Sequence, residues 1–184
     1  MASTSPELVV EHGTRFLGTA EPRLTWRAPA DLADWTQAGA EVAVDRGRGW
    51  EVHRLDGPES VLVAWPFAPL VSREQVAVRV RVAGTDGRQT AWSDEVQLEA
   101  ALLLPGDWVA RMVAPDLPED PDGLHPPPLL RRSFDVGPEP VSARLHVTAH
   151  GLYSAWVSGS RVSDHLFAPV GAPTASACAT RPTT

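Results

Sequence analysis

Apolar and polar residues alternate at every second position in several parts of the chain, which is the period of a half-buried β-strand. In residues 22–28 (PRLTWRA), Leu24 and Trp26 alternate with polar side chains, so this stretch predicts a core strand with a tryptophan anchor. The clearest alternation lies in residues 75–99, where four apolar side chains share one face of a predicted strand: Val76, Val78, Val80 and Val82. Arg79 and Arg81 fall on the opposite face.

Short segments rich in glycine separate these stretches and predict hairpin turns. Gly47-Arg48-Gly49 divides two apolar runs within residues 40–55, and Asp86-Gly87 follows the valine strand. Val96 and Leu98 then resume the alternation on a returning strand. A turn-rich all-β fold is therefore expected for the first hundred residues.

A break follows, and then a second β-unit is predicted. Residues 114–128 hold six prolines and four acidic residues, which excludes a helix interior or a central strand and indicates a surface loop. Residues 129–136 (LLRRSFDV) and 141–162 return to a period of two, with Ser158-Gly159 as the next turn. In the later strand, Ala143, Leu145, Val147 and Ala149 are expected to share one face.

Composition supports this class and excludes others. Eighteen prolines and 14 glycines among 184 residues favour a β-fold over a helical bundle, and a net charge of −7 argues against nucleic-acid binding. Cys178 is the single cysteine, so neither an internal disulfide nor a thiolate zinc site is expected. The first residues lack a signal-peptide pattern and no apolar run is long enough to span a membrane, which predicts a cytoplasmic protein without membrane contact.

Two groups of residues have side chains of metal-binding types, but neither is predicted to bind a metal. His146 and His150 would lie on one strand face, but four residues of strand separate them by roughly 13 Å, too far to share a zinc ion. The acidic residues of the proline-rich loop lack calcium-loop spacing, and we expect a solvated loop instead. These residues are Asp116, Glu119, Asp120 and Asp122.

Tryptophan offers one further candidate chemistry. Trp65, Trp108 and Trp156 could stack on sugar rings, although tryptophan in a β-sandwich more often packs in the core. No nucleophile elbow, phosphate loop or Cys-His pair is present. The residues thus predict no catalytic, cofactor-binding or metal-binding site, and no cofactor.

Several motifs in fixed order resemble the N-terminal region of bacterial α-L-rhamnosidases. They are PRLTWR, WPFAPLVSREQVAVRV, the AWS after the Asp86-Gly87 turn, LLLPGDWVARMVAP and GLYSAWVSGSRV, within residues 6–170. The resemblance implies a fibronectin type III-like (immunoglobulin-like) sandwich in residues 1–100. Residues 101–170 would be the truncated start of the family's N-terminal jelly-roll-like β-sandwich. Val76 stands where that module usually has the tyrosine of a tyrosine corner.

The resemblance also implies an activity and where its machinery lies. The family hydrolyses terminal α-L-rhamnosides with inversion, which requires a carboxylic acid and a carboxylate base. In the family this pair sits on an (α/α)₆ barrel that the chain does not include, so no activity is expected from the chain alone. A downstream catalytic fragment is an expected partner, and rhamnosyl glycosides would be bound only through that missing catalytic domain. A stand-alone carbohydrate- or protein-binding module is the alternative.

The last residues, 171–184, are small and polar without an apolar period. If residues 173–184 are written in GC-rich codons and read one base earlier, they spell YRQRLRYQTYDV, which resembles the family's continuation. We therefore expect a frameshifted tail here, and an incomplete second sandwich with an unpaired edge. The nucleotide sequence through this point tests that expectation.

Overall fold

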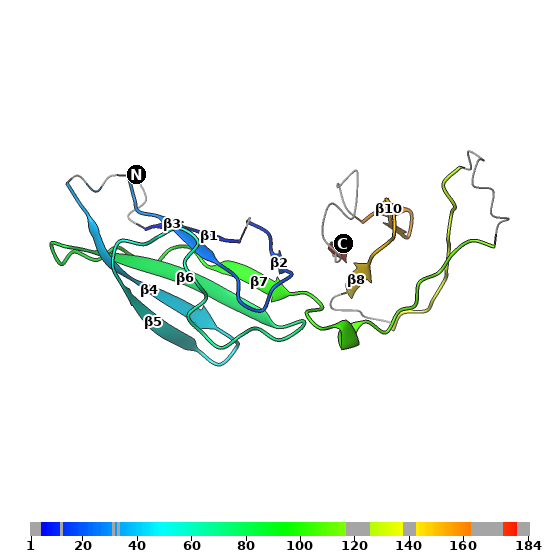
Figure 1. Ribbon diagram of the computed structural model, residues 1–184, viewed down its shortest axis with the longest axis horizontal. Coiled ribbons are helices and arrows are strands. Elements are labelled where there is room, and N and C mark those ends of the chain that lie inside the picture. The colour runs from blue at the N-terminus through cyan, green and yellow to red at the C-terminus, as the bar shows by residue number, and fades with distance from the viewer. Residues whose placement is uncertain are drawn as a thin grey trace. The chain divides into compact units, whose positions relative to one another are not determined.

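A computed structural model describes residues 5–11, 13–30, 32, 34–116, 126–137, 143–162 and 175–179. The chain divides into two compact units, Met1–Trp108 and Val109–Thr184 (Figure 1). The described elements are strands apart from one short 3₁₀ helix, which confirms the all-β prediction.

The first unit is a sandwich of two sheets. Its strands are β1 (Glu7–Val10), β2 (Phe16–Leu17), β3 (Leu24–Arg27), β4 (Gln37–Asp45), β5 (Trp50–Asp56), β6 (Gln75–Gly84) and β7 (Val96–Ala100). One sheet pairs β1 with β3, and the other has the order β2-β7-β6-β4-β5 (Figure 1). Two backbone hydrogen bonds between Leu24 and Val63, of 2.9 and 2.8 Å, extend the smaller sheet. This arrangement confirms the immunoglobulin-like sandwich.

Side chains from both sheets meet in a single apolar core. The alternation of β6 buries Val76, Val78, Val80 and Val82 to 2% exposure or less, as predicted. From the opposite sheet, Leu24 and Trp26 are buried in the same cluster, and the Nε1 of Trp26 donates to Gln37 Oε1 at 3.0 Å. The two strands with the strongest sequence signal thus form the centre of the unit.

The predicted hairpin between β4 and β5 is present. The carboxylate of Asp45 accepts hydrogen bonds from the backbone nitrogens of Gly47, Arg48 and Gly49 at 2.7, 3.0 and 3.0 Å. Gly47 and Gly49 have φ angles of 79° and 100°, a region that a side chain disfavours. Asp45 and the two glycines therefore set the turn.

The 3₁₀ helix η1 (Pro105–Asp107) ends the first unit, and four strands are described in the second. They are β8 (Ala143–Val147), β9 (Trp156–Val157), β10 (Ser160–Arg161) and β11 (Ala175–Ala179). Ser158 and Gly159 both have positive φ, 51° and 82°, which confirms a two-residue turn between β9 and β10. β11 pairs antiparallel with β8, although residues 171–184 show no apolar period. Backbone pairing does not depend on such a period.

Two strand predictions in the second unit are wrong. Residues 129–136 form no strand, because no described segment pairs with them. β8 ends at Val147, so Ala149 and His150 lie beyond the strand, at a bend that includes His150 and Gly151. Alternation shows that a segment can present one apolar face, but the segment forms a strand only where another strand pairs with it.

Candidate functional site

The outer face of the five-stranded sheet carries an unusual group of arginine and tryptophan side chains. Because neighbours along a strand point to opposite faces, the valines of β6 face the core and Arg79 and Arg81 face outward. The pairing register sets Arg81 opposite Glu41 on β4, and Glu41 in turn opposite Arg54 on β5. We call the outward residues Glu41, Trp50, Arg54, Arg79, Arg81 and Trp92 the Arg-Trp face.

Arg79 lies between two indole rings. Its guanidinium carbon is 3.8 Å from the ring centroid of Trp50 and 4.7 Å from that of Trp92. Arg79 forms no ion pair with a described residue, and its Nε is buried without a hydrogen-bond partner there. The attraction between a cation and the negative face of an indole stabilises this arrangement.

Glu41 forms ion pairs with two neighbouring arginines. Its side chain is only 8% exposed and accepts from the Nη2 of Arg81 at 2.5 Å and from the Nε of Arg54 at 2.9 Å. One carboxylate is thus shared by two guanidinium groups and neutralises only one of their two positive charges. Arg79 adds a further positive charge. The Arg-Trp face therefore combines flat aromatic rings with net positive charge.

The AWS motif holds Trp92 in place. Ser93 donates its backbone N–H to Val80 O at 2.7 Å, and its Oγ accepts from Val80 N at 3.0 Å. Trp92, the preceding residue, thereby lies beside β6, where its ring also stands 4.7 Å from the guanidinium carbon of Arg81. The rings are positioned by backbone pairing rather than by a mobile loop.

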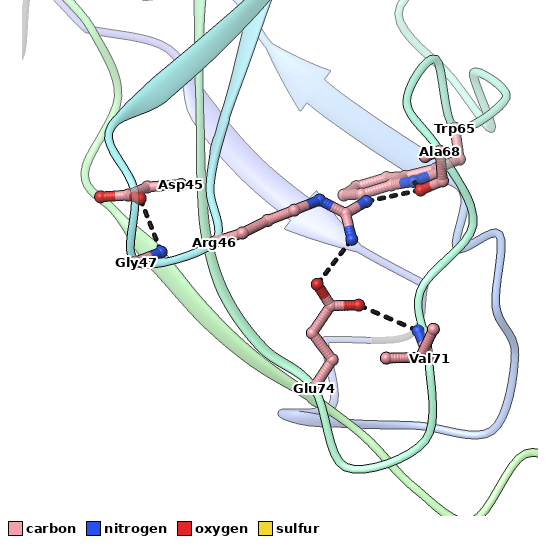
Figure 2. A network of polar contacts seen from close by, with 7 residues as sticks. All are labelled: Asp45, Arg46, Gly47, Trp65, Ala68, Val71 and Glu74. Carbon is pink, nitrogen blue, oxygen red and sulfur yellow. Dashed lines mark hydrogen bonds and ion pairs between the residues drawn. The ribbon is translucent and has the colours of Figure 1, made fainter.

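A second polar network fixes the long connection between β5 and β6 (Figure 2). Arg46 donates to Glu74 Oε1 at 2.6 Å and to the carbonyl of Ala68 at 2.5 Å. The other oxygen of Glu74 accepts from Val71 N at 2.9 Å, and the indole N–H of Trp65 also donates to Ala68 O, at 3.0 Å (Figure 2). Val76 stands at the usual tyrosine position and is buried in the core, so no tyrosine hydroxyl is present to secure this connection. The network of Arg46 and Glu74 tethers the connection instead.

The exit from the first unit is fixed by Asp107. Its carboxylate accepts from the hydroxyl of Ser72 and from Leu104 N, the latter at 2.8 Å, while Ser72 Oγ accepts from Leu103 N at 2.9 Å. The hydrogen bond from Ser72, followed by that from Leu104, holds the pKa of Asp107 below its ordinary value of 3.8. The DW motif of the sequence is therefore an anchor of the backbone.

The tryptophans singled out in the sequence do not form one sugar platform. Trp65 is 8% exposed and packs at 5.1 Å against the Phe67 ring, so stacking on a sugar is wrong for this residue. Trp108 is half-buried at the end of the first unit, and Trp156 is 56% exposed on β9 of the second. Trp50 and Trp92 were not singled out from the sequence as candidate site residues. The available signal was that Trp50 begins a strand predicted next to the VRVRV strand and that Trp92 follows the turn after it.

The candidate metal residues gather no ligand set. His146 lies in β8 and His150 beyond its end, so the assumption that one strand carries both is corrected. Asp116 is exposed, while Glu119, Asp120 and Asp122 lie outside the described residues. Among the residues with described positions, no three His, Cys, Asp or Glu side chains form a metal-binding group. Nor does this part of the chain contain a helix long and apolar enough to cross a membrane.

The sandwich defines an immunoglobulin-like class, and comparison gives the family. Residues 6–104 match the model of the Rha78A-like, N-terminal immunoglobulin domain, which covers more than half of the chain. The chain belongs to this family, as its sequence motifs indicate.

Relatives over a longer range are α-L-rhamnosidases. The chain is 26% identical over 166 residues to the α-L-rhamnosidase of Formosa agariphila and 27% identical over 188 residues to that of Streptomyces avermitilis. These alignments cover 82% and 87% of this chain but 18% of each relative.

The crystal structure of native α-L-rhamnosidase from Aspergillus terreus is 41% identical, with a TM-score of 0.78. This likeness covers 90% of the chain and 20% of the Aspergillus protein. The chain thus spans about a fifth of the length of its relatives.

Proposed function

We propose that the chain is the N-terminal, non-catalytic part of an α-L-rhamnosidase, an inverting hydrolase that releases terminal α-L-rhamnose. The observation that carries the proposal is the 41% identity to one-fifth of the Aspergillus terreus enzyme across 90% of this chain. Inversion needs an acid and a base about 6.5–9.5 Å apart, with room for water. We place that pair on polypeptide outside the 184 residues, so the immunoglobulin-like sandwich supplies scaffold.

A chimera tests this function. The matching N-terminal fifth of the Aspergillus terreus enzyme is replaced by this chain, and hydrolysis of an aryl α-L-rhamnoside is measured. We expect the chimera to be active and the isolated 184-residue chain to be inactive. As a reference, the Aspergillus enzyme is also assayed without its N-terminal fifth.

Two results would contradict the proposal. The first is release of rhamnose by the isolated chain, because its cleavage chemistry would then lie within these residues. The second is a chimera that unfolds cooperatively, as circular dichroism reports, yet has no activity. Both results leave the immunoglobulin-like fold itself unaffected.

The Arg-Trp face favours a second function, that of a binding module for a sugar or a protein. Val52, 49% exposed on the same strand as Trp50 and Arg54, adds apolar surface to the positive charge. Calorimetry of the isolated chain with L-rhamnose or an aryl rhamnoside separates the two readings, since a scaffold has no measurable affinity. Any binding that survives Trp50→Ala would exclude this face as the site.

Three expectations complete the proposal. A separate catalytic polypeptide would be the partner of the chain, the location would be the cytoplasm and the source a bacterium. The frameshift in residues 171–184 also remains a prediction, tested by the nucleotide sequence through this segment.

A further inference from the structure

The two edges of the five-stranded sheet differ in length. One edge is β2, which has two residues, whereas the other is β5, which has seven and pairs only with β4 among the described strands (Figure 1). A long edge strand presents a row of backbone N–H and C=O groups to which a further strand can pair. β5 is therefore the edge of the first unit that is open to pairing.

The faces of β5 are open as well. Residues 51–54 are all exposed, so no described segment buries this stretch from either side. Natural edge strands are often blunted by proline, by a bulge or by free charge. β5 contains no proline, and its register with β4 has no shift. The charge of Arg54 is already engaged, because its Nε donates to Glu41 at 2.9 Å.

The sequence of β5 complements itself when two copies pair antiparallel about Val52. In a two-fold symmetric pair both copies contribute the same patch, and side chains that stand opposite each other lie on the same face. Val52, which is 49% exposed, then lies opposite Val52 of the second copy. Trp50 lies opposite Arg54, and Glu51 opposite His53. An indole thus meets a guanidinium, and a carboxylate meets an imidazole that can donate to it.

Other symmetric registers in the middle of β5 bring unfavourable groups together. A centre at Glu51 or at Arg54 places two like charges directly opposite each other, which destabilises a strand pair. A centre at His53 places Val52 opposite the charge of Arg54. A centre between two residues would set side chains of opposite faces against each other. The register about Val52 is thus the one that the side chains select.

We propose that the first unit forms a symmetric dimer with a second copy of this chain, in which the two β5 strands pair antiparallel about Val52. The pairing joins residues 50–54 of both copies and makes one continuous sheet from two five-stranded sheets. A single strand pair is a small interface, so dilution dissociates this dimer. The dimer depends on the immunoglobulin-like sandwich alone and is independent of the proposed hydrolase function.

Sedimentation equilibrium of the 184-residue chain tests the dimer. We expect the average mass to rise about twofold, from one chain to two, as the chain concentration approaches about 1 mM. In Val52→Arg two like charges meet at the centre of the pair, so this variant should stay monomeric. Val61→Arg is the control, because Val61 is 69% exposed in the connection between β5 and β6, and this variant should dimerise. An unaltered chain that is monomeric at about 1 mM, or equal masses of the two variants, would overturn the proposal.

Disulfide cross-linking tests the register and does not require Val52→Arg to fold. Val52→Cys and His53→Cys are made in a chain that carries Cys178→Ser, so that each variant has one thiol. Directly opposed residues of an antiparallel pair have Cα atoms about 4.5–5.5 Å apart, which a disulfide can bridge. The two copies of residue 53 would stand about 8 Å apart, which is too far.

Oxidation of these variants with diamide should therefore cross-link about tenfold more of the Val52→Cys chain than of the His53→Cys chain. Equal cross-linking, or a preference for His53→Cys, would overturn the register about Val52. Absence of cross-linking in both variants at about 1 mM would overturn the dimer itself.

Discussion

The two units share a sequence pattern but differ in what they do with it. In the first unit, the alternating strands β3 and β6 belong to opposite sheets, so the side chains of Trp26 and Val80 pack into one core from its two sides. In the second, Leu130, Phe134 and Val136 fall on one face of a period of two that Arg132 interrupts, and Phe134 is 72% exposed. A period of two thus shows that a segment can present an apolar face. Burial of that face depends on a second face from elsewhere.

The largest expected effect is loss of a core anchor from the first unit. Trp26→Ala removes an indole that is 2% exposed and leaves Gln37 without its hydrogen-bond donor. We expect the free energy of unfolding to fall by about 3–5 kcal/mol, the usual cost of such a truncation. Urea unfolding followed by circular dichroism measures it. A loss below about 1 kcal/mol would show that this sandwich is not the stable part of the chain.

A smaller effect is expected from the network of Figure 2. Glu74→Ala removes the carboxylate that joins Arg46 to Val71 N, with 17% of the Glu74 side chain exposed. Partial exposure limits the expected loss to about 1–2 kcal/mol. Glu51→Ala, an exposed glutamate on β5, is the control and should change stability by less than about 0.5 kcal/mol.

A double-mutant cycle sharpens that result. If Arg46 and Glu74 act together, the losses from Arg46→Ala and Glu74→Ala should be less than additive, because the second change removes a partner already lost. Additive losses would mean that the ion pair does not couple the hairpin to the connection between β5 and β6.

The pH dependence of the first unit should reflect Asp107. Because its pKa is lowered in the folded state, its ionised form adds stability above the unfolded pKa, and that stability is lost as the pH falls below about 4. In Ser72→Ala the main cause of the shift is absent. The thermal midpoint of this variant should therefore fall less steeply from about pH 5 to pH 3 than that of the unaltered chain. Parallel curves would exclude the Ser72 hydrogen bond as the cause.

Local patterns made much of the first unit predictable. The alternating valines, the glycines after Asp45 and the DG turn each act within a few residues, so strands and hairpins of this unit followed from them. The Arg-Trp face did not follow, because Trp50, Arg79 and Trp92 meet only through the register of β4, β5 and β6. Similarly, the sequence did not indicate whether Trp65 is exposed to solvent or packs against Phe67.

The smallest expected effect is the most direct test of the contrast between the units. In the isolated chain Phe134→Ser changes a side chain that is already 72% exposed, outside any described strand. The urea midpoint of the sandwich should therefore shift by less than the equivalent of about 0.5 kcal/mol, because little apolar area returns to water. A loss of 2 kcal/mol or more in the isolated chain, about the cost of a buried side chain, would mean that Phe134 is already packed and that its partner lies within these 184 residues.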